Sequence, residues 1–202
     1  KDDIQSNTEW IENALRSMVF HGELCPGSDH PEGVIAERLG VSPTLLRRAA
    51  LALEAEGLLS VRPRKGLHVP SVSPRDMREV YDVLTELECL AAENAARLAY
   101  DRTALRGLAD AVNAMDEALL RDDRDAWADS DHAFHSELVR LGQNRRVEAI
   151  FATMEDQVRR AKQMTLHARP LPTQSNRDHR DVLGAIAAHD PEQARRIHRR
   201  HR

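Results

Sequence analysis

Apolar residues recur at helical spacing through most of the chain, and they predict its first three elements. Residues 8–21 carry an apolar stripe with a period of about 3.6 residues, which is typical of a helix with one buried face. The stripe consists of Trp10, Ile11, Ala14, Leu15, Met18 and Val19. Two further helices are predicted over 31–40 and over 43–56, the latter with Ser42 as its N-cap.

A hairpin is predicted after the third helix, between residues 58 and 70. The short β-prone runs "LLSV" and "LHVP" flank the basic turn "RPRKG". Two helices joined by the short "GVS" turn and followed by a basic hairpin describe a winged helix-turn-helix, expected over residues 1–70. In this fold the second helix of the pair enters the major groove of DNA, and the hairpin lies along the adjacent backbone or minor groove.

The rest of the chain reads as helices only. The Pro/Ser-containing stretch 71–76 predicts a linker. Ser73 and Pro74 are expected to cap a helix that runs to Tyr100. Further helices are predicted over 103–121, 124–142, 145–168, 176–188 and 191–201. The expected fold class is therefore mainly α, with an N-terminal winged helix-turn-helix and an all-α helical bundle over residues 77–202.

Composition narrows the class of protein. Aromatic residues make up only 3% of the 202 residues, which favours helix-on-helix packing over a β-sandwich. No apolar run approaches the roughly 20 residues that span a bilayer, so no membrane association is expected. Two cysteines, Cys25 and Cys89, are too few for a disulfide framework in a chain of this size, and a reducing cytoplasm is the expected location.

The charge distribution favours DNA binding although the net charge is −4. A negative protein is a poor partner for phosphate on average, but a local basic surface is sufficient. Between Ser42 and His68 the basic side chains outnumber the acidic ones, Glu54 and Glu56, by three. The basic residues there are Arg47, Arg48, Arg62, Arg64 and Lys65.

Two stretches carry a family resemblance that together covers nearly the whole chain. "GVSPTLLRRAALALEAEGLLSVRPRKGLHV" resembles the DNA-binding domain of the GntR family of bacterial transcription regulators. The segments "DSDHAFH", "RLGQN", "DHRDVLGAIAAHD" and "ARRIHRRH" resemble the FCD effector domain of the FadR branch. The resemblance implies a ligand-responsive regulator that binds double-stranded operator DNA as a homodimer.

The expected DNA contacts lie on the second helix of the pair and on the hairpin. They are Ser42, Thr44, Arg47, Arg48, Arg62, Arg64, Lys65 and Gly66. Pro43 and Gly33 stand where the family often has arginine, and Arg48 replaces a common glutamate. Readout of the operator sequence is therefore expected to differ from that of the family, while phosphate binding is retained.

The stretch "DSDHAFH" is a candidate half of a metal site. Asp131 and His135 are four residues apart and share a helix face, whereas His132 points about 100° away from Asp131. Two ligands are too few, since such metals take at least three protein groups. The resemblance supplies His179 and His201 as the other ligands. It leaves outside the site His132, His167, His189 and His198.

Three imidazoles and one carboxylate suit a divalent transition metal, Zn²⁺, Ni²⁺, Mn²⁺ or Fe²⁺, with open positions for water or an acid. A small carboxylate effector is expected. Leu84 replaces a family arginine that can clamp such a ligand, so the candidate effector-binding residues are Glu88, Arg159 and Arg160. Asn144 is expected to cap a helix.

Two alternatives remain open for the metal. A metal-dependent, hydrolase-like enzyme could use the His/Asp site to activate water. The chain shows neither a nucleophile motif nor a phosphate loop, so it is not expected to be an enzyme. The metal could also be purely structural in a regulator.

Overall fold

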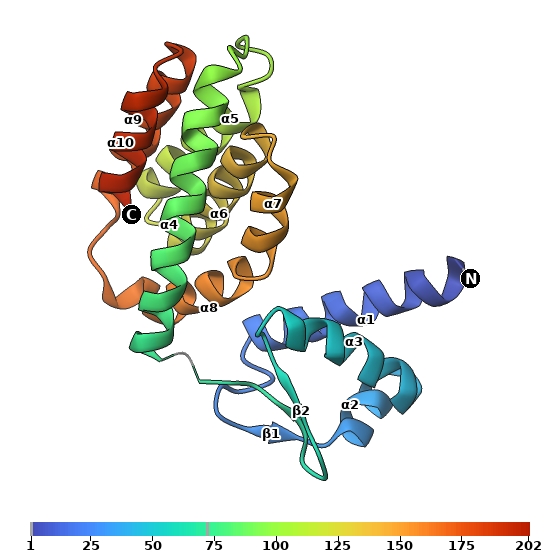
Figure 1. Ribbon diagram of the computed structural model, residues 1–202. Helices are drawn as coiled ribbons and strands as arrows, with labels where there is room; N and C mark the ends of the chain where they lie inside the picture. The colour runs from blue at the N-terminus through green and yellow to red at the C-terminus, as the bar shows by residue number, and fades with distance from the viewer. Residues whose placement is uncertain (1, 72) are drawn as a thin grey trace. The chain divides into compact units, whose positions relative to one another are not determined.

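The computed structural model describes residues 2–71 and 73–202 and consists of two compact units, Lys1–Pro74 and Arg75–Arg202. The predicted class is confirmed, because the chain is mainly α with one small sheet in the first unit (Figure 1). Within the described ranges, no helix combines the length and apolar character that crossing a bilayer requires.

The first unit contains three helices and a three-stranded antiparallel sheet. Its elements are α1 (Asp2–Phe20), β1 (Asp29–His30), α2 (Glu32–Leu39), α3 (Pro43–Ala55), β2 (Ser60–Arg62) and β3 (Gly66–His68). The strand order is β1-β3-β2, with Asp29 opposite His68 and Val61 opposite Leu67. The hairpin β2–β3 was predicted. Strand β1 was not, because two residues are too short to show an alternating pattern.

Local signals in the sequence account for the ends of the helices in this unit. The Ser42 hydroxyl accepts a hydrogen bond from the Leu45 amide at 3.3 Å, the N-cap contact expected of it. Gly40 ends α2 in the left-handed conformation. Trp10 is 52% exposed, contrary to its predicted place in the buried stripe, because the core-facing line of α1 runs through Ile11, Leu15 and Val19.

Gly66 is required by the close approach of β1 to the hairpin. Its φ is +90°, and an added Cβ would overlap the carbonyl oxygen of His30. Gly66→Ala is therefore expected to lower the free energy of unfolding of this unit by about 2–4 kcal/mol. The matched control is Gly33→Ala in α2, where no atom lies within 4 Å of the new Cβ. Thermal and urea denaturation of the two variants check this, and equal stabilities would contradict it.

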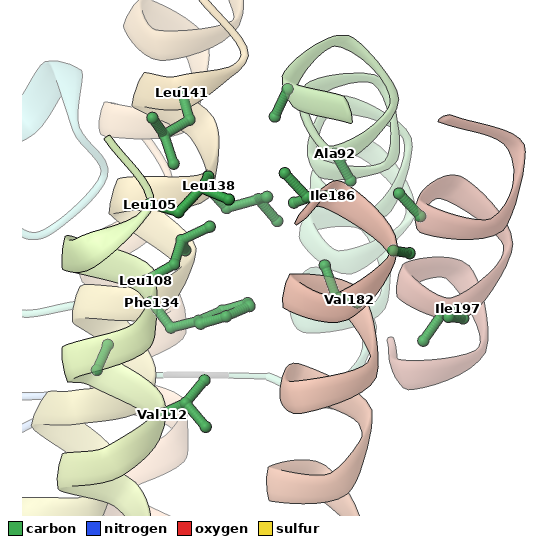
Figure 2. Packing of buried hydrophobic residues seen from close by; sticks show 14 of the residues in the cluster. Ala92, Leu105, Leu108, Val112, Phe134, Leu138, Leu141, Val182, Ile186 and Ile197 are labelled. Carbon is green, nitrogen blue, oxygen red and sulfur yellow. The ribbon is translucent and has the colours of Figure 1, made fainter. Parts of the chain in front are cut away.

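The second unit is an all-α bundle. Its elements are α4 (Pro74–Arg97), α5 (Arg106–Leu120), α6 (Arg124–Leu141), α7 (Arg145–Ala152), α8 (Glu155–Thr165), the 3₁₀ turn η1 (Leu166–Ala168), α9 (Thr173–Ala187) and α10 (Pro191–His201). Leu108 of α5, Phe134 and Leu138 of α6, and Val182 of α9 interdigitate in the main core (Figure 2). Phe134 and Leu138 are inaccessible to solvent. Side chains of α6 and α9 meet in this core, where the ring centroids of Phe134 and His179 lie 4.3 Å apart.

The single helix predicted over 145–168 is wrong, since the structure divides it into α7, α8 and η1. At the break, the amides of Thr153 and Met154 bond to carbonyls three residues earlier, those of Ile150 and Phe151. The Thr153 hydroxyl also bonds to the Ile150 carbonyl at 2.7 Å, a contact that competes with helix continuation. The turn lets Phe151 and Val158 enter the same apolar cluster.

Two other helix starts differ from prediction, and one predicted cap is confirmed. Helix α5 begins at Arg106 rather than 103, because Asp101 caps a preceding turn through the Ala104 amide at 2.8 Å. Helix α9 begins at Thr173 rather than 176. Asn144 accepts hydrogen bonds from the amides of Arg146 and Val147 at 3.1 and 3.3 Å, so it caps α7 as expected.

Candidate functional site

Four side chains from three helices converge inside the second unit. Asp131 and His135 lie one turn apart on α6, His179 lies on α9 and His201 on α10. One ligand atom from each lies within 4.8 Å of all the others. The core packing of α6 against α9 therefore brings together all four residues that the sequence indicated as ligands.

The spacing of the ligand atoms fits one metal ion. His179 Nε2 lies 3.4 Å from His135 Nε2 and 3.5 Å from Asp131 Oδ1, and His135 Nε2 lies 3.7 Å from Asp131 Oδ1. Ligands bound tetrahedrally to zinc at its usual bond lengths lie about 3.3–3.6 Å apart. The His201 ring lies tilted against the His179 ring, with centroids 4.3 Å apart and an interplanar angle of 55°. The ligand atoms of Asp131, His135 and His179 thus have nearly the spacing of a tetrahedral zinc site, and a ligand atom of His201 lies within 4.8 Å of each of them.

The electrostatics of the cluster favour the protonation states that bind metals. Burial lowers the pKa of His179 well below its ordinary value, and neighbouring His135 lowers it further. Burial also lowers the pKa of His201. Burial raises the pKa of Asp131, but Lys162 and His135 hold that pKa well below its ordinary value. These two imidazoles are therefore neutral at physiological pH and Asp131 is a carboxylate.

Glu88 of α4 lies behind this cluster, fully buried. Its Oε2 is 3.3 Å from His135 Nδ1, the ring nitrogen opposite the one that faces Asp131 and His179. Such a carboxylate orients a ligating imidazole and selects its tautomer. Burial raises the pKa of Glu88, but His135, Arg202 and the hydrogen bond from His198 hold it well below its ordinary value.

His198 and Arg202 complete the surroundings of Glu88. His198 Nε2 lies 2.8 Å from Glu88 Oε2, and the Arg202 guanidinium donates to both carboxylate oxygens at 2.7 and 2.5 Å. Glu88, His135 and His198 form a second group with metal-ligand spacing. Because Arg202 already supplies a positive charge to both Glu88 oxygens, a second metal is disfavoured there.

The other histidines expected outside the site lie apart from the ligand cluster. His132 is half-buried, with Nε2 3.7 Å from Glu155 Oε2, while His167 and His189 are exposed. His198 was grouped with them, but the structure places it fully buried against Glu88, within 5.6 Å of the His135 ring centroid. His198 and His201 are three residues apart on one helix, and this spacing in the sequence indicated that both side chains lie on the same buried face.

A cavity of about 390 Å³ adjoins the ligand cluster. We name it the Trp127–Lys162 cavity after two of its lining residues. Asp131 and His201 line it beside the cations Lys162 and Arg202. The Lys162 ammonium pairs with Asp131. Sequence reasoning missed both cations. The signal for Lys162 was its position four residues after Val158, on the buried face of α8.

The three candidate effector residues are not gathered around this cavity. Glu88 and Arg159 line a smaller neighbouring cavity of about 30 Å³, and Arg159 pairs with Asp129 at 2.8 Å. Arg160 is buried, and it is not among the residues lining either cavity. Arg159 and Arg160 were chosen for their charge, which does not determine which way a side chain on α8 points.

In the first unit, the candidate DNA contacts lie on the exposed surface of α3 and on the β2–β3 turn. The exposed members are Ser42, Thr44, Arg47, Arg48, Arg62, Arg64 and Lys65. Gly66 is buried, so it shapes the turn rather than presenting a contact. Arg47 pairs with Glu32 at 2.9 Å.

The basic residues of the hairpin are partly neutralised by one acid. Arg62 and Lys65 lie 3.3 and 3.5 Å from the Asp29 carboxylate, and His68 Nδ1 lies 2.7 Å from it. DNA phosphates would compete with Asp29 and Glu32 for these exposed cations, and exposed pairs of this kind are weak.

Comparisons with known families agree with the division of the chain into two units. Residues 7–69 match the family described as bacterial regulatory proteins, gntR family, and residues 79–202 match the FCD domain. An uncharacterized HTH-type transcriptional regulator of Agrobacterium vitis, from the TAR-I ttuE-ttuC′ intergenic region, is 38% identical over 131 residues, which are 64% of this chain and 74% of that protein.

Two further comparisons extend over nearly the whole chain. The HTH-type transcriptional repressor RspR of Escherichia coli K12 is 24% identical over 198 residues, covering 98% of this chain and 86% of that protein. The structure of E. coli McbR/YncC aligns with a TM-score of 0.80 at 23% identity, over 95% of this chain and 91% of that one, which supports the fold. These relatives are regulators rather than enzymes, in agreement with the prediction.

Proposed function

The chain belongs to the GntR family of bacterial regulatory proteins and is a DNA-binding transcription regulator with an FCD domain, and we propose that this domain senses a small carboxylate through a bound divalent metal. The metal is Zn²⁺, Ni²⁺, Mn²⁺ or Fe²⁺, held by four side chains. These are Asp131, His135, His179 and His201.

One observation carries this proposal: four ligand atoms converge within 4.8 Å of one another beside the Trp127–Lys162 cavity, which is also lined by Lys162. A bound divalent metal would supply open coordination positions for a carboxylate oxygen. Lys162, now paired with Asp131, is the flexible cation nearest to such a ligand. The carboxylate ligand and the metal would thus both interact with the buried pair of Asp131 and Lys162.

Regulation requires that the effector bind two arrangements of the protein unequally. Glu88 of α4 contacts His135, one of the proposed metal ligands, and α4 follows directly after residues 71–73 in the chain. A change in the metal site is therefore passed to the helix nearest the DNA-binding unit in sequence. We propose that the chain acts as a homodimer, which lets two recognition helices read two half-sites of operator DNA.

The test is a DNA-binding titration with a duplex selected in vitro by the metal-loaded protein. Affinity is measured by fluorescence anisotropy at fixed salt, with and without a panel of small carboxylates, on metal-loaded and metal-depleted protein. We expect at least one acid to change the affinity of the metal-loaded form only. Metal-dependent DNA binding without a response to any acid would instead support a purely structural metal.

Arg47→Ala is expected to weaken binding to the selected duplex by about 1–3 kcal/mol, because the variant loses a groove contact from the exposed face of α3. Arg121→Ala in the second unit is the control, since Arg121 is also exposed and also paired with a glutamate, Glu117 at 3.8 Å. Anisotropy titrations at matched salt measure both. Equal affinities of the two variants would remove Arg47 from the interface.

A further inference from the structure

In the lining of the Trp127–Lys162 cavity, the apolar residues Trp127 and Leu166 each lie four residues, about one helical turn, from the charged residues Asp131 and Lys162. We therefore distinguish a charged end and an apolar end. At the charged end, Arg202 has both Glu88 oxygens as partners and is 4% exposed, so it is committed to the protein. Lys162 is 18% exposed and makes one ion pair, with Asp131. Lys162 is therefore the cation that can turn to an incoming carboxylate.

The apolar end is built around Trp127. Its indole N–H donates to Asn176 Oδ1 at 2.6 Å, and the Asn176 amide in turn donates to Asp116 at 2.9 Å. The only donor of the indole is thus used inside the protein. Trp127 presents carbon surface to the cavity, beside Leu166 and Pro172.

The segment after α8, which forms one wall of the cavity, is joined to the start of α6 by Arg124. The Arg124 guanidinium donates to the carbonyls of Leu166 and Arg169, at 2.9 and 2.6 Å. Pro170 and Pro172 further restrict this segment. The cavity is therefore a preformed feature of the fold, and its volume of about 390 Å³ lies at the small end of the range for ligand pockets.

Apart from Asp131, Lys162, His201 and Arg202, the polar side chains of the lining are those of Tyr81, whose ring lies against the Arg202 guanidinium, Ser175 and Arg169. Ser175 and Tyr81 carry hydroxyls, and Arg169 is an exposed residue of the lining. A ligand rich in hydroxyls would leave several of them without partners, which weakens binding. A second carboxylate would find only the exposed Arg169, whose ion pairs are screened by water.

From these features we infer that the effector is a monocarboxylic acid with a flat or cyclic apolar body, such as a one-ring aromatic acid. The carboxylate lies toward Lys162 and the metal ligands Asp131 and His201, and the body lies against Trp127 and Leu166. This inference rests on the proposed function, and it names the class of effector that the proposed site takes.

The test uses the full chain loaded with Zn²⁺ in a Trp10→Phe background, so that Trp127 is the remaining tryptophan. Benzoate, cyclohexanecarboxylate, acetate, gluconate, glutarate and neutral benzamide are titrated while tryptophan fluorescence is followed, and calorimetry measures each affinity. We expect benzoate and cyclohexanecarboxylate to bind about 30-fold or more tightly than acetate, gluconate or glutarate, because they bury a larger apolar body. Benzamide is expected not to bind, since it lacks the charge.

A pair of variants separates the two ends of the cavity. Leu166→Gln is expected to reduce benzoate affinity about tenfold while leaving acetate affinity unchanged, because only benzoate reaches Leu166. The control is Leu171→Gln, an exposed residue of the same segment that does not line this cavity. Fluorescence titration of both variants reads the difference.

The outcomes distinguish this inference from the proposed function. Tighter binding of gluconate or glutarate than of benzoate, dependent on Zn²⁺, would overturn the effector class and leave the proposed metal-dependent sensing intact. Binding of none of the acids to the Zn²⁺-loaded chain would overturn both. Benzoate binding that ignores Leu166→Gln would place the ligand outside this cavity and contradict the inference.

Discussion

His179→Ala is expected to weaken metal binding on the order of 10²–10³-fold and to leave the purified protein without stoichiometric metal. Structural zinc sites bind with about 10–16 kcal/mol, so one ligand of four is worth roughly 3–4 kcal/mol. His179 is inaccessible to solvent and lies within 3.5 Å of both His135 and Asp131 ligand atoms. No exposed group can therefore take its place without repacking α9.

The measurement combines metal content with thermal stability. In the parent, added metal should raise Tm because it binds only the folded state, and this increment should vanish in His179→Ala. His167→Ala, which removes an exposed histidine of the same unit, is the control and should keep both metal and increment. Equal metal content in His179→Ala and the parent would exclude His179 from the site.

Arg202→Met is expected to lower the free energy of unfolding by about 3–5 kcal/mol, because it leaves the buried Glu88 carboxylate without the guanidinium that donates to both of its oxygens. Glu88 is fully buried and receives two guanidinium hydrogen bonds, at 2.7 and 2.5 Å. The double variant Glu88→Gln/Arg202→Met removes the unpaired charge as well, and it should recover most of the loss.

The control for this cycle is Arg200→Met. Arg200 lies in the last turn of α10, two residues before Arg202, and pairs with Asp178 at 3.0 Å. Its side chain is 64% exposed, so the expected cost is at most about 1 kcal/mol. Urea denaturation of the metal-depleted parent and of the three variants measures these differences. Similar losses for Arg200→Met and Arg202→Met would show that burial of the Glu88 pair does not determine its contribution.

Helical periodicity predicted most of the fold because nearly every helix has one buried face. The pattern could not locate the break at Thr153, since both sides of the break continue the same apolar spacing and the turn depends on hydrogen bonds to Ile150 and Phe151. The sequence pattern did not predict strand β1, for another reason. Its two residues are held by pairing with β3, where Asp29 lies opposite His68, 39 positions later in the sequence.

The candidate metal site was predictable in part. The four-residue spacing of Asp131 and His135 indicated a shared helix face, and the family resemblance supplied His179 and His201. The surroundings were not predictable, because they depend on contacts distant in sequence. Lys162 meets Asp131 across 31 residues, and Arg202 meets Glu88 across 114. Arg159 and Arg160 were chosen for their charge alone, while the orientation of α8 determines which cation faces the cavity.

The metal content of the purified, untagged chain decides whether the cluster of Asp131, His135, His179 and His201 binds a metal ion. The protein is dialysed against metal-free buffer without chelator, and its elements are quantified by mass spectrometry. We expect about one equivalent of a divalent transition metal per chain. Absence of metal, with no uptake when Zn²⁺, Ni²⁺, Mn²⁺ or Fe²⁺ is added, would contradict it. The Asp131–His135–His179–His201 cluster would then be a buried polar network, and only the DNA-binding function would stand.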